Sequence, residues 1–244
     1  MSSGRVAWLA ADDSPDAFPP VSSALSEPDG LLAAGGDLST PRLLAAYRQG
    51  IFPWYDEGQP LLWWSPDPRC VFERGDLHLS RRIRKEIRRS TLDIRFNTAF
   101  TEVIEACAGP RRHQTGTWIT RDMLAAYDRL NREGWAHSVE VWRDDDLVGG
   151  LYGLAIGRAF FGESMFSRES NASKMALLTV DGLLNDGRLG ILDCQVRSSH
   201  LLSLGASTMP RSTFVTRLDD LCEPPGAFRG WPDTPLRVAD LDEA

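Results

Sequence analysis

Residues 139–195 constrain the fold of this chain most, because three strand patterns follow one another there. Residues 139–142 alternate in polarity as a half-buried strand does. After a polar turn, residues 147–154 have the pattern of a returning strand and residues 158–163 that of a third. The order predicts a mixed fold in which a sheet is built from neighbouring strands.

A helix and a last strand complete this region. Residues 170–173 form a capping cluster ahead of apolar residues at helical spacing. Residues 190–196 are an apolar strand interrupted by Asp193 and Gln195. Residues two apart on a strand point to one face, so we expect these two side chains to lie together and Leu192 to face away. Strands, a helix and a strand with buried polar groups make a scaffold suited to group transfer.

Length and composition limit the class of protein. With 244 residues the chain is long enough for one large domain, or for a main domain with a smaller companion. Its hydrophobic and charged fractions, 42% and 25%, are those of ordinary globular proteins. No apolar run is long enough to span a bilayer, and no basic segment followed by an apolar core begins the chain. We therefore expect a soluble, unexported protein that makes no membrane contact.

Cysteine, histidine and charge usage add three expectations. The four cysteines lie far apart without a CxxC pair, which is typical of reduced thiols in a cytoplasm. The four histidines lack metal-ligand spacing, so we expect no metal site and no cofactor. The net charge of -7 argues against a surface that is basic throughout, although not against a local basic patch.

The N-terminal part has its own pattern. Residues 1–28 are expected to be an extended lead-in, and Ser39 or Thr40 to cap a helix that ends at Gly50. The pair Gly35 and Gly36 could be a phosphate loop or a plain turn, and the missing Lys-Ser/Thr favours the turn. A proline-rich stretch at 66–68 predicts a boundary between a small domain, residues 1–67, and a main domain, residues 68–244.

Two aromatic segments, residues 51–55 and 61–69, allow two interpretations. Their rings could fill the seam between the two domains. Ring faces also stack on nucleobases, with about 1–3 kcal/mol for each base. Composition does not decide between the two.

A basic segment follows at residues 79–89. Ser80 can cap a helix in which Ile83 and Ile87 face inward. The outward positions then carry a cluster of cations: Arg81, Arg82, Arg84, Lys85, Arg88 and Arg89. Such a run is often only a solvated helix face. In an acidic protein, however, concentrated arginine is the expected footprint of a phosphate backbone.

The remaining helices are predicted by apolar spacing. Residues 100–107 form one, residues 121–133 form a second that Thr120 caps, and residues 198–204 form a short third. The stretch from about residue 222 onward is rich in Pro, Asp and Gly, so a surface tail is expected.

Several motifs together resemble those of the leucyl/phenylalanyl-tRNA–protein transferase family. The motifs match in the family's order from about residue 18 to residue 214. They include EPDGLL at 27–32, GGDL at 35–38, GIFPW at 50–54, WWSPDPR at 63–69, GTWIT at 116–120, HSVEVW at 137–142, GESMFSR at 162–168, NASK at 171–174, DCQV at 193–196 and HLLSLGA at 200–206.

This resemblance implies a fold and a pocket. The fold class is α/β (α+β), with a small N-terminal α/β domain and a C-terminal domain similar to GCN5-related N-acetyltransferases. Trp54 and Trp118 would contact the terminal adenosine of tRNA, and Val180 stands where a bulkier residue is expected. The implied pocket for an apolar, β-unbranched side chain is lined by Leu151, Phe160, Leu177 and Leu192.

The resemblance also implies an activity. Members are aminoacyltransferases that move Leu or Phe, and also Met, from aminoacyl-tRNA to the α-amine of proteins that begin with Arg or Lys. This reaction feeds protein degradation by the N-end rule. We expect a cytoplasmic monomer, and the sequence leaves the preferred donor open.

The resemblance also implies that the reacting centre lies at Asp193 and Gln195. An amide cannot act as a base near neutral pH, so Gln195 would hold the amine through its carbonyl oxygen while Asp193 orients it. The same pair could also be purely structural. Leu192 can reach the pocket only if the strand contains a bulge or ends there. Glu163 would either receive an amine or pair with Arg168.

Two other functions compete with this one. An acyl-CoA-dependent N-acetyltransferase needs a glycine-containing loop whose backbone N–H groups bind pyrophosphate. Residues 168–173 lack glycine and carry Glu169, which disfavours that alternative. A noncatalytic RNA-binding protein would use the basic segment, but would leave the polar residues on the core strand unexplained.

Overall fold

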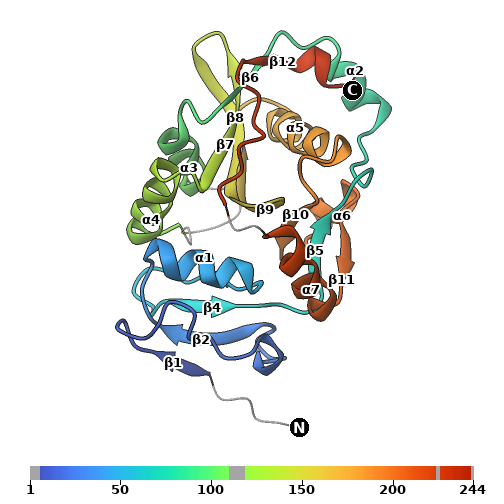
Figure 1. Cartoon of the computed structure of the whole chain (residues 1–244). Helices are drawn as coiled ribbons and strands as arrows, with labels where there is room; N and C mark the ends of the chain where they lie inside the picture. The colour runs from blue at the N-terminus through green and yellow to red at the C-terminus, as the bar shows by residue number, and fades with distance from the viewer. Residues whose placement is uncertain (1–5, 110–118, 224–225, 243–244) are drawn as a thin grey trace.

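The computed structural model describes residues 6–109, 119–223 and 226–242. In these residues the chain forms two β-sheets joined by a short segment after the fourth strand. Figure 1 shows the smaller sheet at the N-terminal end, with helix α1 between it and the larger part.

The smaller sheet has the strand order β1-β2-β4-β3 in the described chain. Strand β1 lies inside the predicted lead-in and pairs in parallel with β2, so that segment is not simply an extended surface stretch. The elements are β1 (Ala7–Leu9), the 3-10 turn η1 (Val21–Ser23), β2 (Leu31–Gly35), α1 (Thr40–Arg48), β3 (Phe52–Pro53) and β4 (Leu62–Trp64).

The larger sheet has the order β11-β5-β10-β9-β8-β7-β6-β12 in the described residues. Helices α3 and α4 pack against one face of its centre and α5 against the other (Figure 1). Its strands are β5 (Arg69–Phe72), β6 (Asp93–Phe96), β7 (Ala136–Arg143), β8 (Asp146–Ile156), β9 (Ala159–Ser167), β10 (Ile191–Gln195), β11 (Ser207–Met209) and β12 (Leu236–Arg237). The helices are α2 (Arg81–Ile87), α3 (Phe100–Ala108), α4 (Arg121–Arg132), α5 (Ala172–Asn185), α6 (Ser199–Ser203), α7 (Arg211–Leu221) and the 3-10 helix η2 (Val238–Asp242).

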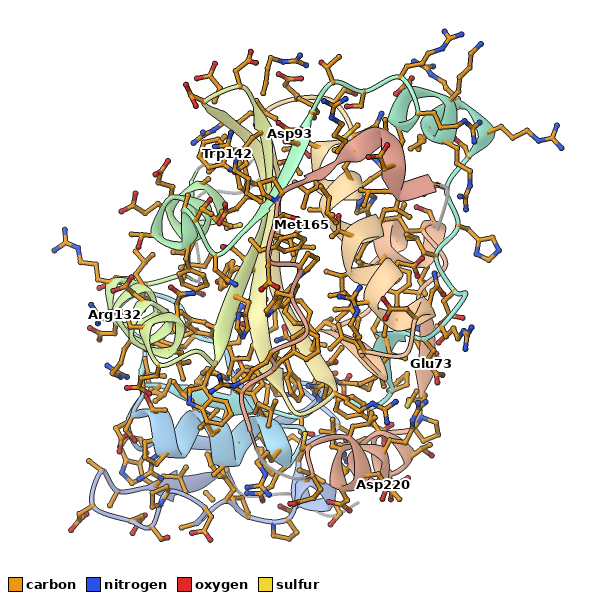
Figure 2. All side chains as sticks on the ribbon, turned by 45° about the horizontal axis from the view of Figure 1, so that its top comes forward. Glu73, Asp93, Arg132, Trp142, Met165 and Asp220 are labelled. Atoms are coloured by element: carbon orange, nitrogen blue, oxygen red, sulfur yellow. The ribbon has the colours of Figure 1, made fainter. Side chains whose placement is uncertain are left out.

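The predicted antiparallel run of strands is confirmed. Strands β6, β7, β8 and β9 pair in antiparallel fashion, and Asp93 opposite Trp142 marks the β6/β7 pairing (Figure 2). Gly149 lets α5 approach this sheet closely, because a Cβ there would lie 2.4 Å from the Cβ of Ala172. The helix that follows the strands is therefore held tightly against them.

Two of the predicted N-caps are confirmed and two differ. Ser39 lies at the N-cap position of α1, but its side chain makes no capping hydrogen bond. The side chains of Ser80 and Thr120 accept hydrogen bonds from the third residue after each, as N-caps do. The cluster before α5 does not cap in that way. Asn171 lies there in a left-handed conformation without a side-chain cap, and the Ser167 Oγ accepts from Ser173 N at 2.8 Å.

Strands β9 and β10 create an opening in the sheet. They pair in parallel only where residues 159–161 face residues 191–193. Beyond that point β9 stays with β8 up to Ser167, while β10 continues along β5. Two diverging strands leave a space between them, and the polar residues of β10 lie at its edge.

The predicted surface tail is wrong in part, because the segment packs on the larger sheet at several points although Arg229 and Asp233 are exposed. Strand β12 pairs with β6, Val238 is fully buried and Phe228 is nearly so. Both side chains belong to the apolar cluster of α5 and the larger sheet. Their burial stabilises the packing of this segment, and a composition rich in Pro and Gly does not predict it.

The mixed α/β class with a small N-terminal part is confirmed. The boundary at residue 67 stays a prediction, although the smaller sheet ends at Trp64 and the larger begins at Arg69. One apolar cluster contains side chains from both sheets, among them Trp63 and Phe161, together with Tyr47 of α1.

Candidate active site

The largest candidate site is a cavity of about 440 Å³ between the diverging strands β9 and β10. It is bounded by β8 and β9 on one side and by α5, β10 and α6 on the other. The four predicted pocket residues, Leu151, Phe160, Leu177 and Leu192, all line it. Their apolar side chains, with Met165 (Figure 2), make a site that favours an apolar group.

A smaller cavity of about 140 Å³ lies beside the first. Trp54, Gln195 and Val196 line it, and Glu163 and Cys194 line both cavities. Because they share a wall, two groups bound in the two cavities would meet next to Glu163.

The aromatic segments contain both buried and exposed rings, and the stacking of nucleobases on them stays a prediction. Trp63 is fully buried in the apolar cluster, as a seam residue would be. Trp54 is 41% exposed, and its ring packs on Trp64 at 5.6 Å between centroids. Trp54 therefore offers an open ring face at the smaller cavity. Trp118 lies outside the described residues.

Glu163 is hydrogen-bonded to a side chain of the N-terminal helix α1. Its Oε1 accepts hydrogen bonds from the Tyr47 hydroxyl at 2.7 Å and from Gln195 Nε2 at 2.8 Å. The Tyr47 hydroxyl is also hydrogen-bonded to that of Tyr127. Burial raises the pKa of Glu163 to about 7, although the bonds from Tyr47, Tyr127 and Gln195 lower it in part. The group can thus gain or lose a proton near neutral pH.

The predicted pairing of Glu163 with Arg168 is wrong. The Arg168 guanidinium donates to the Leu147 carbonyl oxygen at 2.8 Å and lies over the Phe166 ring. Arg168 follows the end of β9, and both contacts of its side chain lie away from Glu163.

Asp193 is completely buried and forms an ion pair that the sequence analysis did not predict. Arg69 Nε lies 2.8 Å from Oδ1, and Arg69 Nη2 lies 2.7 Å from Oδ2. The same guanidinium donates to the Gly50 carbonyl oxygen at 2.9 Å and lies between the rings of Phe52 and Phe214. Asp193 therefore contacts protein groups rather than either cavity.

Gln195 departs from regular strand geometry. The pairing of β10 with β5 shifts between Asp193 and Gln195, and Gln195 has a φ of 62°. Its backbone N–H donates to Asp193 Oδ1 at 2.8 Å. The irregularity comes after Leu192, so Leu192 faces away from Asp193 as regular alternation predicts, and it lines the larger cavity without a bulge. The expectation that Leu192 needs a bulge is therefore wrong. The irregularity instead removes the face that Asp193 and Gln195 were expected to share: Gln195 lines the smaller cavity and Asp193 points into the core.

The amide of Gln195 is oriented by one hydrogen bond. Nε2 donates one of its two hydrogens to Glu163, so the carbonyl oxygen and the second hydrogen remain for a ligand in the smaller cavity. Glu163, rather than Asp193, holds this amide group. Asp193 acts on the backbone of the same residue.

The start of α5 is not prepared for a pyrophosphate. Its first three backbone N–H groups already donate, to oxygens of Glu169, Ser167 and Asn171 at 3.2, 2.8 and 2.9 Å. The Glu169 carboxylate, paired with Arg143 at 2.6 Å, adds a negative charge there. This geometry disfavours the acyl-CoA alternative.

Helix α2 presents its cations to solvent and lies next to the start of α5. Ile87 is fully buried beneath it, while Arg82 has an 89% exposed side chain. Glu86 accepts from Asn171 Nδ2 at 2.7 Å and so ties α2 to the residue before α5. Figure 2 shows the long side chains of α2 extending outward. The exposed members of the predicted set are Arg81, Arg82, Lys85, Arg88 and Arg89, and Arg84 is half-buried.

Three site residues were missed by the sequence analysis as functional. Tyr47 and Tyr127 lie within predicted helices and Arg69 within a motif, but none of the three was given a role. A tyrosine on a buried face carries a hydroxyl that needs a partner, and an arginine at the start of an apolar strand needs an anion. The sequence therefore indicated that these three side chains need partners, but it did not indicate which residues the partners are.

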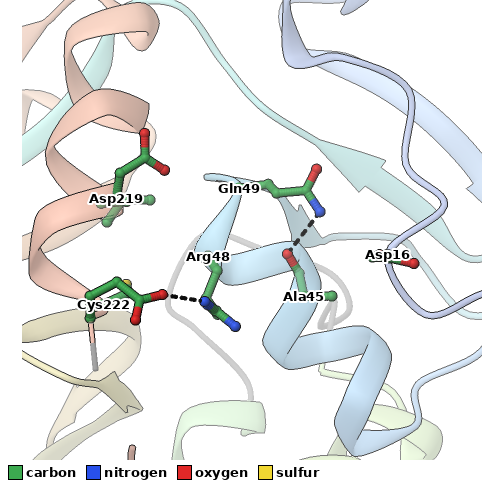
Figure 3. Close-up of a pocket in the computed structure, with 8 residues that line it drawn as sticks. Asp16, Ala45, Arg48, Gln49, Asp219 and Cys222 are labelled. Carbon is green, nitrogen blue, oxygen red and sulfur yellow. Dashed lines mark hydrogen bonds and ion pairs between the residues drawn. The ribbon is translucent and has the colours of Figure 1, made fainter. Parts of the chain in front are cut away.

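A separate cavity of about 360 Å³ lies between α1 and α7 (Figure 3). Some of its polar groups are already engaged: Arg48 pairs with Glu223 at 2.8 Å, and Gln49 donates to the Ala45 carbonyl oxygen. Burial raises the pKa of Cys222 to about 12, so its thiol stays protonated. This cavity contains none of the predicted site residues.

Two properties of the described residues bear on the class of site. They contain no group of three or more His, Cys, Asp or Glu side chains placed to hold a metal ion. None of their helices combines the length and apolar character that crossing a bilayer requires.

Comparisons with known proteins point to one family. Residues 71–219 match the model described as leucyl/phenylalanyl-tRNA protein transferase, and residues 36–67 match the model of its N-terminal domain. The chain is similar to leucyl/phenylalanyl-tRNA–protein transferases of Nitrosomonas europaea (55% identical, 88% of this chain and 91% of that one), Stutzerimonas stutzeri (56%, 86% and 92%) and Aromatoleum aromaticum (57%, 87% and 89%).

Among solved structures, a GCN5-related N-acetyltransferase-like protein from Streptococcus suis shares 12% identity with this chain. The match covers 66% of this chain and 60% of that one, with a TM-score of 0.32. A likeness of this size says nothing about function.

Proposed function

Because the chain belongs to the leucyl/phenylalanyl-tRNA protein transferase family and so transfers aminoacyl groups from tRNA to proteins, we propose specific substrates for it. The donors are Leu, Phe or Met esters of tRNA, and the acceptor is the α-amine of a protein that begins with Arg or Lys. The products would enter N-end-rule degradation. Family membership removes the noncatalytic RNA-binding alternative.

The observation that supports this proposal best is the pair of cavities that share Glu163. The larger one has polar residues in its lining, but Leu151, Phe160, Leu177 and Leu192 form an apolar part of its wall against which an aminoacyl side chain can pack. Each methylene in such a pocket is worth about 1–3 kcal/mol, enough to prefer Leu over smaller side chains. The opening beside Gln195 and Trp54 would hold the ester and the amine.

The chemistry needs positioning more than a strong base. The ester is already activated, and an α-amino group with a pKa of about 7.7–8.0 is partly neutral near neutral pH. Orienting two bound reactants can supply about 7–11 kcal/mol. In the proposed reaction the amine nitrogen bonds to the ester carbon and the bond to the ribose oxygen breaks. One proton passes from the nitrogen to that oxygen, directly or through water.

Each polar residue has a proposed role in this step. The Gln195 carbonyl oxygen accepts a hydrogen bond from the amine and favours the positive charge that develops on nitrogen. Asp193 fixes the backbone of Gln195 and is a positioning residue, because it touches no cavity. Glu163 fixes the Gln195 amide and lies where an amine from the donor or acceptor would bind.

The remaining tRNA contacts are proposed from ring faces and charge. Trp54, together with Trp118, would stack on the terminal adenosine, and the exposed cations of α2 would bind phosphates. A tRNA substrate and free cysteines throughout the described residues support a cytoplasmic location. We propose that the protein acts as a monomer.

The decisive test is transfer itself. The protein would be incubated with radiolabelled leucyl-tRNA and a peptide beginning with Arg, and label in the peptide would be counted. Absence of label with active substrates would contradict the proposed activity.

The pocket is tested by enlarging one wall residue. Leu151→Trp should abolish transfer, because the indole fills the cavity, while retention of tRNA on a filter stays unchanged. Leu202→Trp is the matched control, since Leu202 is 45% exposed on α6 and does not line the cavity. Loss of transfer and retention together in Leu151→Trp would contradict the pocket assignment.

A further inference from the structure

The C-terminal segment from residue 226 onward lies beyond the family match, which ends at residue 219, yet it is built into the fold. Gly157 N donates to the Gly226 carbonyl oxygen at 2.9 Å, and Arg188 Nη1 donates to the Gly230 carbonyl oxygen at 2.7 Å. Further on, Val238 N donates to the Leu92 carbonyl oxygen at 2.9 Å. In Figure 1 this segment, coloured dark red, runs along the larger sheet toward β12. It is fixed at several points and can therefore hold a side chain in place.

Trp231 is the side chain that this segment places against the sheet. Its ring packs on His137 at 5.1 Å and on Phe96 at 5.7 Å between centroids, and Phe228 covers it at 5.2 Å. Burial lowers the pKa of His137 to about 4, so the imidazole stays neutral and packs as an uncharged ring. Trp231 is thus enclosed by rings from β6, β7 and its own segment.

The fourth ring that Trp231 touches is Phe160, which lines the larger cavity. Their centroids lie 5.7 Å apart with the planes at 77°. Phe160 is fully buried and also presses on β8, where a Cβ at Gly153 would lie 2.9 Å from its Cζ. Trp231 and Gly153 together fix where the Phe160 ring stands, and that ring forms part of the cavity wall.

From this arrangement we infer that Trp231 is a specificity-determining residue for the donor side chain, acting through Phe160. This inference rests on the proposed function, because it assumes that the larger cavity receives the donor side chain. A shorter residue at 231 would let Phe160 move back from the cavity, and the enlarged site would accept bulkier donors. Trp231 itself would touch no substrate.

The test compares donors in variants of the full chain. Trp231→Leu should raise the ratio of kcat/KM for phenylalanyl-tRNA over leucyl-tRNA about tenfold, the size of effect that small volume changes produce in apolar pockets. Trp231→Phe should raise the same ratio by a smaller factor. This variant replaces Trp231→Leu in the test if Trp231→Leu does not fold. Tryptophanyl-tRNA, a bulkier donor, should gain transfer in Trp231→Leu.

Phe228→Leu is the matched control, because Phe228 packs on Trp231 but forms no ring pair with Phe160. It should lower the Tm without moving the donor ratio. Folded Trp231 variants with the wild-type ratio would overturn the inference. A wild-type protein that transfers neither Leu nor Phe would instead overturn the proposed function.

Discussion

Gln195 is the residue whose surroundings decide most about the site. Asp193 binds its backbone N–H, and Glu163 binds its amide nitrogen. Both carboxylates are in turn held by the segment before residue 70, Asp193 by Arg69 and Glu163 by Tyr47. A left-handed non-glycine residue costs free energy, so these bonds are what keep Gln195 in that conformation.

The raised pKa of Glu163 predicts a pH-dependent stability. Its folded-state pKa of about 7 lies above the ordinary 4.5, so this carboxyl destabilises the fold as pH rises through about 7. A difference of that size corresponds to about 3 kcal/mol when the carboxyl is fully ionised. Glu163→Gln removes the ionisation. Its Tm relative to wild type should therefore rise between about pH 5 and about pH 8.

Thermal melts at several pH values would measure this change. Glu57→Gln, at an exposed position, is the control and should leave the pH dependence as it is in wild type. A Tm difference between Glu163→Gln and wild type that does not change with pH would contradict the assignment.

The buried ion pair predicts strongly non-additive effects. Arg69→Leu alone leaves Asp193 charged and unpaired in the core, which should cost about 3–5 kcal/mol of stability. Replacing both residues by Leu removes the unpaired charge and should recover much of that loss. Transfer should stay low in the double variant, because nothing then holds the backbone of Gln195.

Urea unfolding of Arg69→Leu, Asp193→Leu and the double variant gives the coupling energy between the two residues. If the loss of unfolding free energy in the double variant equals the sum of the losses in the two single variants, the pair is not coupled.

At the scale of elements, the separation of β9 from β10 makes the site. Parallel pairing over residues 159–161 holds the strands together, and its loss beyond them opens the cavity. The alternation of β10 predicted a regular strand, but the irregularity before Gln195 changes which side chains share a face. A bulge is set by contacts with β5 and Arg69, which the local pattern does not contain.

Helix α2 gives a prediction about salt dependence. Reversing charge at Arg82, Arg88 and Arg89 should weaken tRNA binding and reduce the slope of log K against log salt, by about 0.9 for each lost phosphate contact in a duplex. Arg132→Glu, on α4 and away from α2 (Figure 2), is the control. Filter binding over a range of salt concentrations would measure both. An unchanged slope in the triple variant would mean that α2 is only a solvated face.

At the scale of the whole molecule, the two sheets share one apolar cluster. Side chains from α1, from β4 and from α4 meet those of β8 and β9 within it. Arg69 adds a polar connection, because it reaches the Gly50 carbonyl oxygen and the β10 carboxylate at once. A sequence boundary at residue 67 therefore does not imply two independent folding units.

This shared cluster predicts one cooperative unfolding transition. Calorimetry should give a single peak, since neither part keeps its core when the other unfolds. Phe214→Ala, which removes a ring from the cluster and from Arg69, should lower that single Tm and not split the peak. Two resolved transitions in wild type would contradict the prediction.

The sequence by itself determined most of the helices, the antiparallel strands and the mixed fold class. These depend on spacing within a segment, which the sequence states directly. The apolar residues that meet in one cavity were expected from the family resemblance and not from spacing. The tertiary structure decided that Asp193 pairs with Arg69, that Tyr47 holds Glu163 and that Trp231 lies behind Phe160. Each of these contacts joins residues tens of positions apart, and no local pattern records which distant side chain will satisfy a buried charge, hydroxyl or ring.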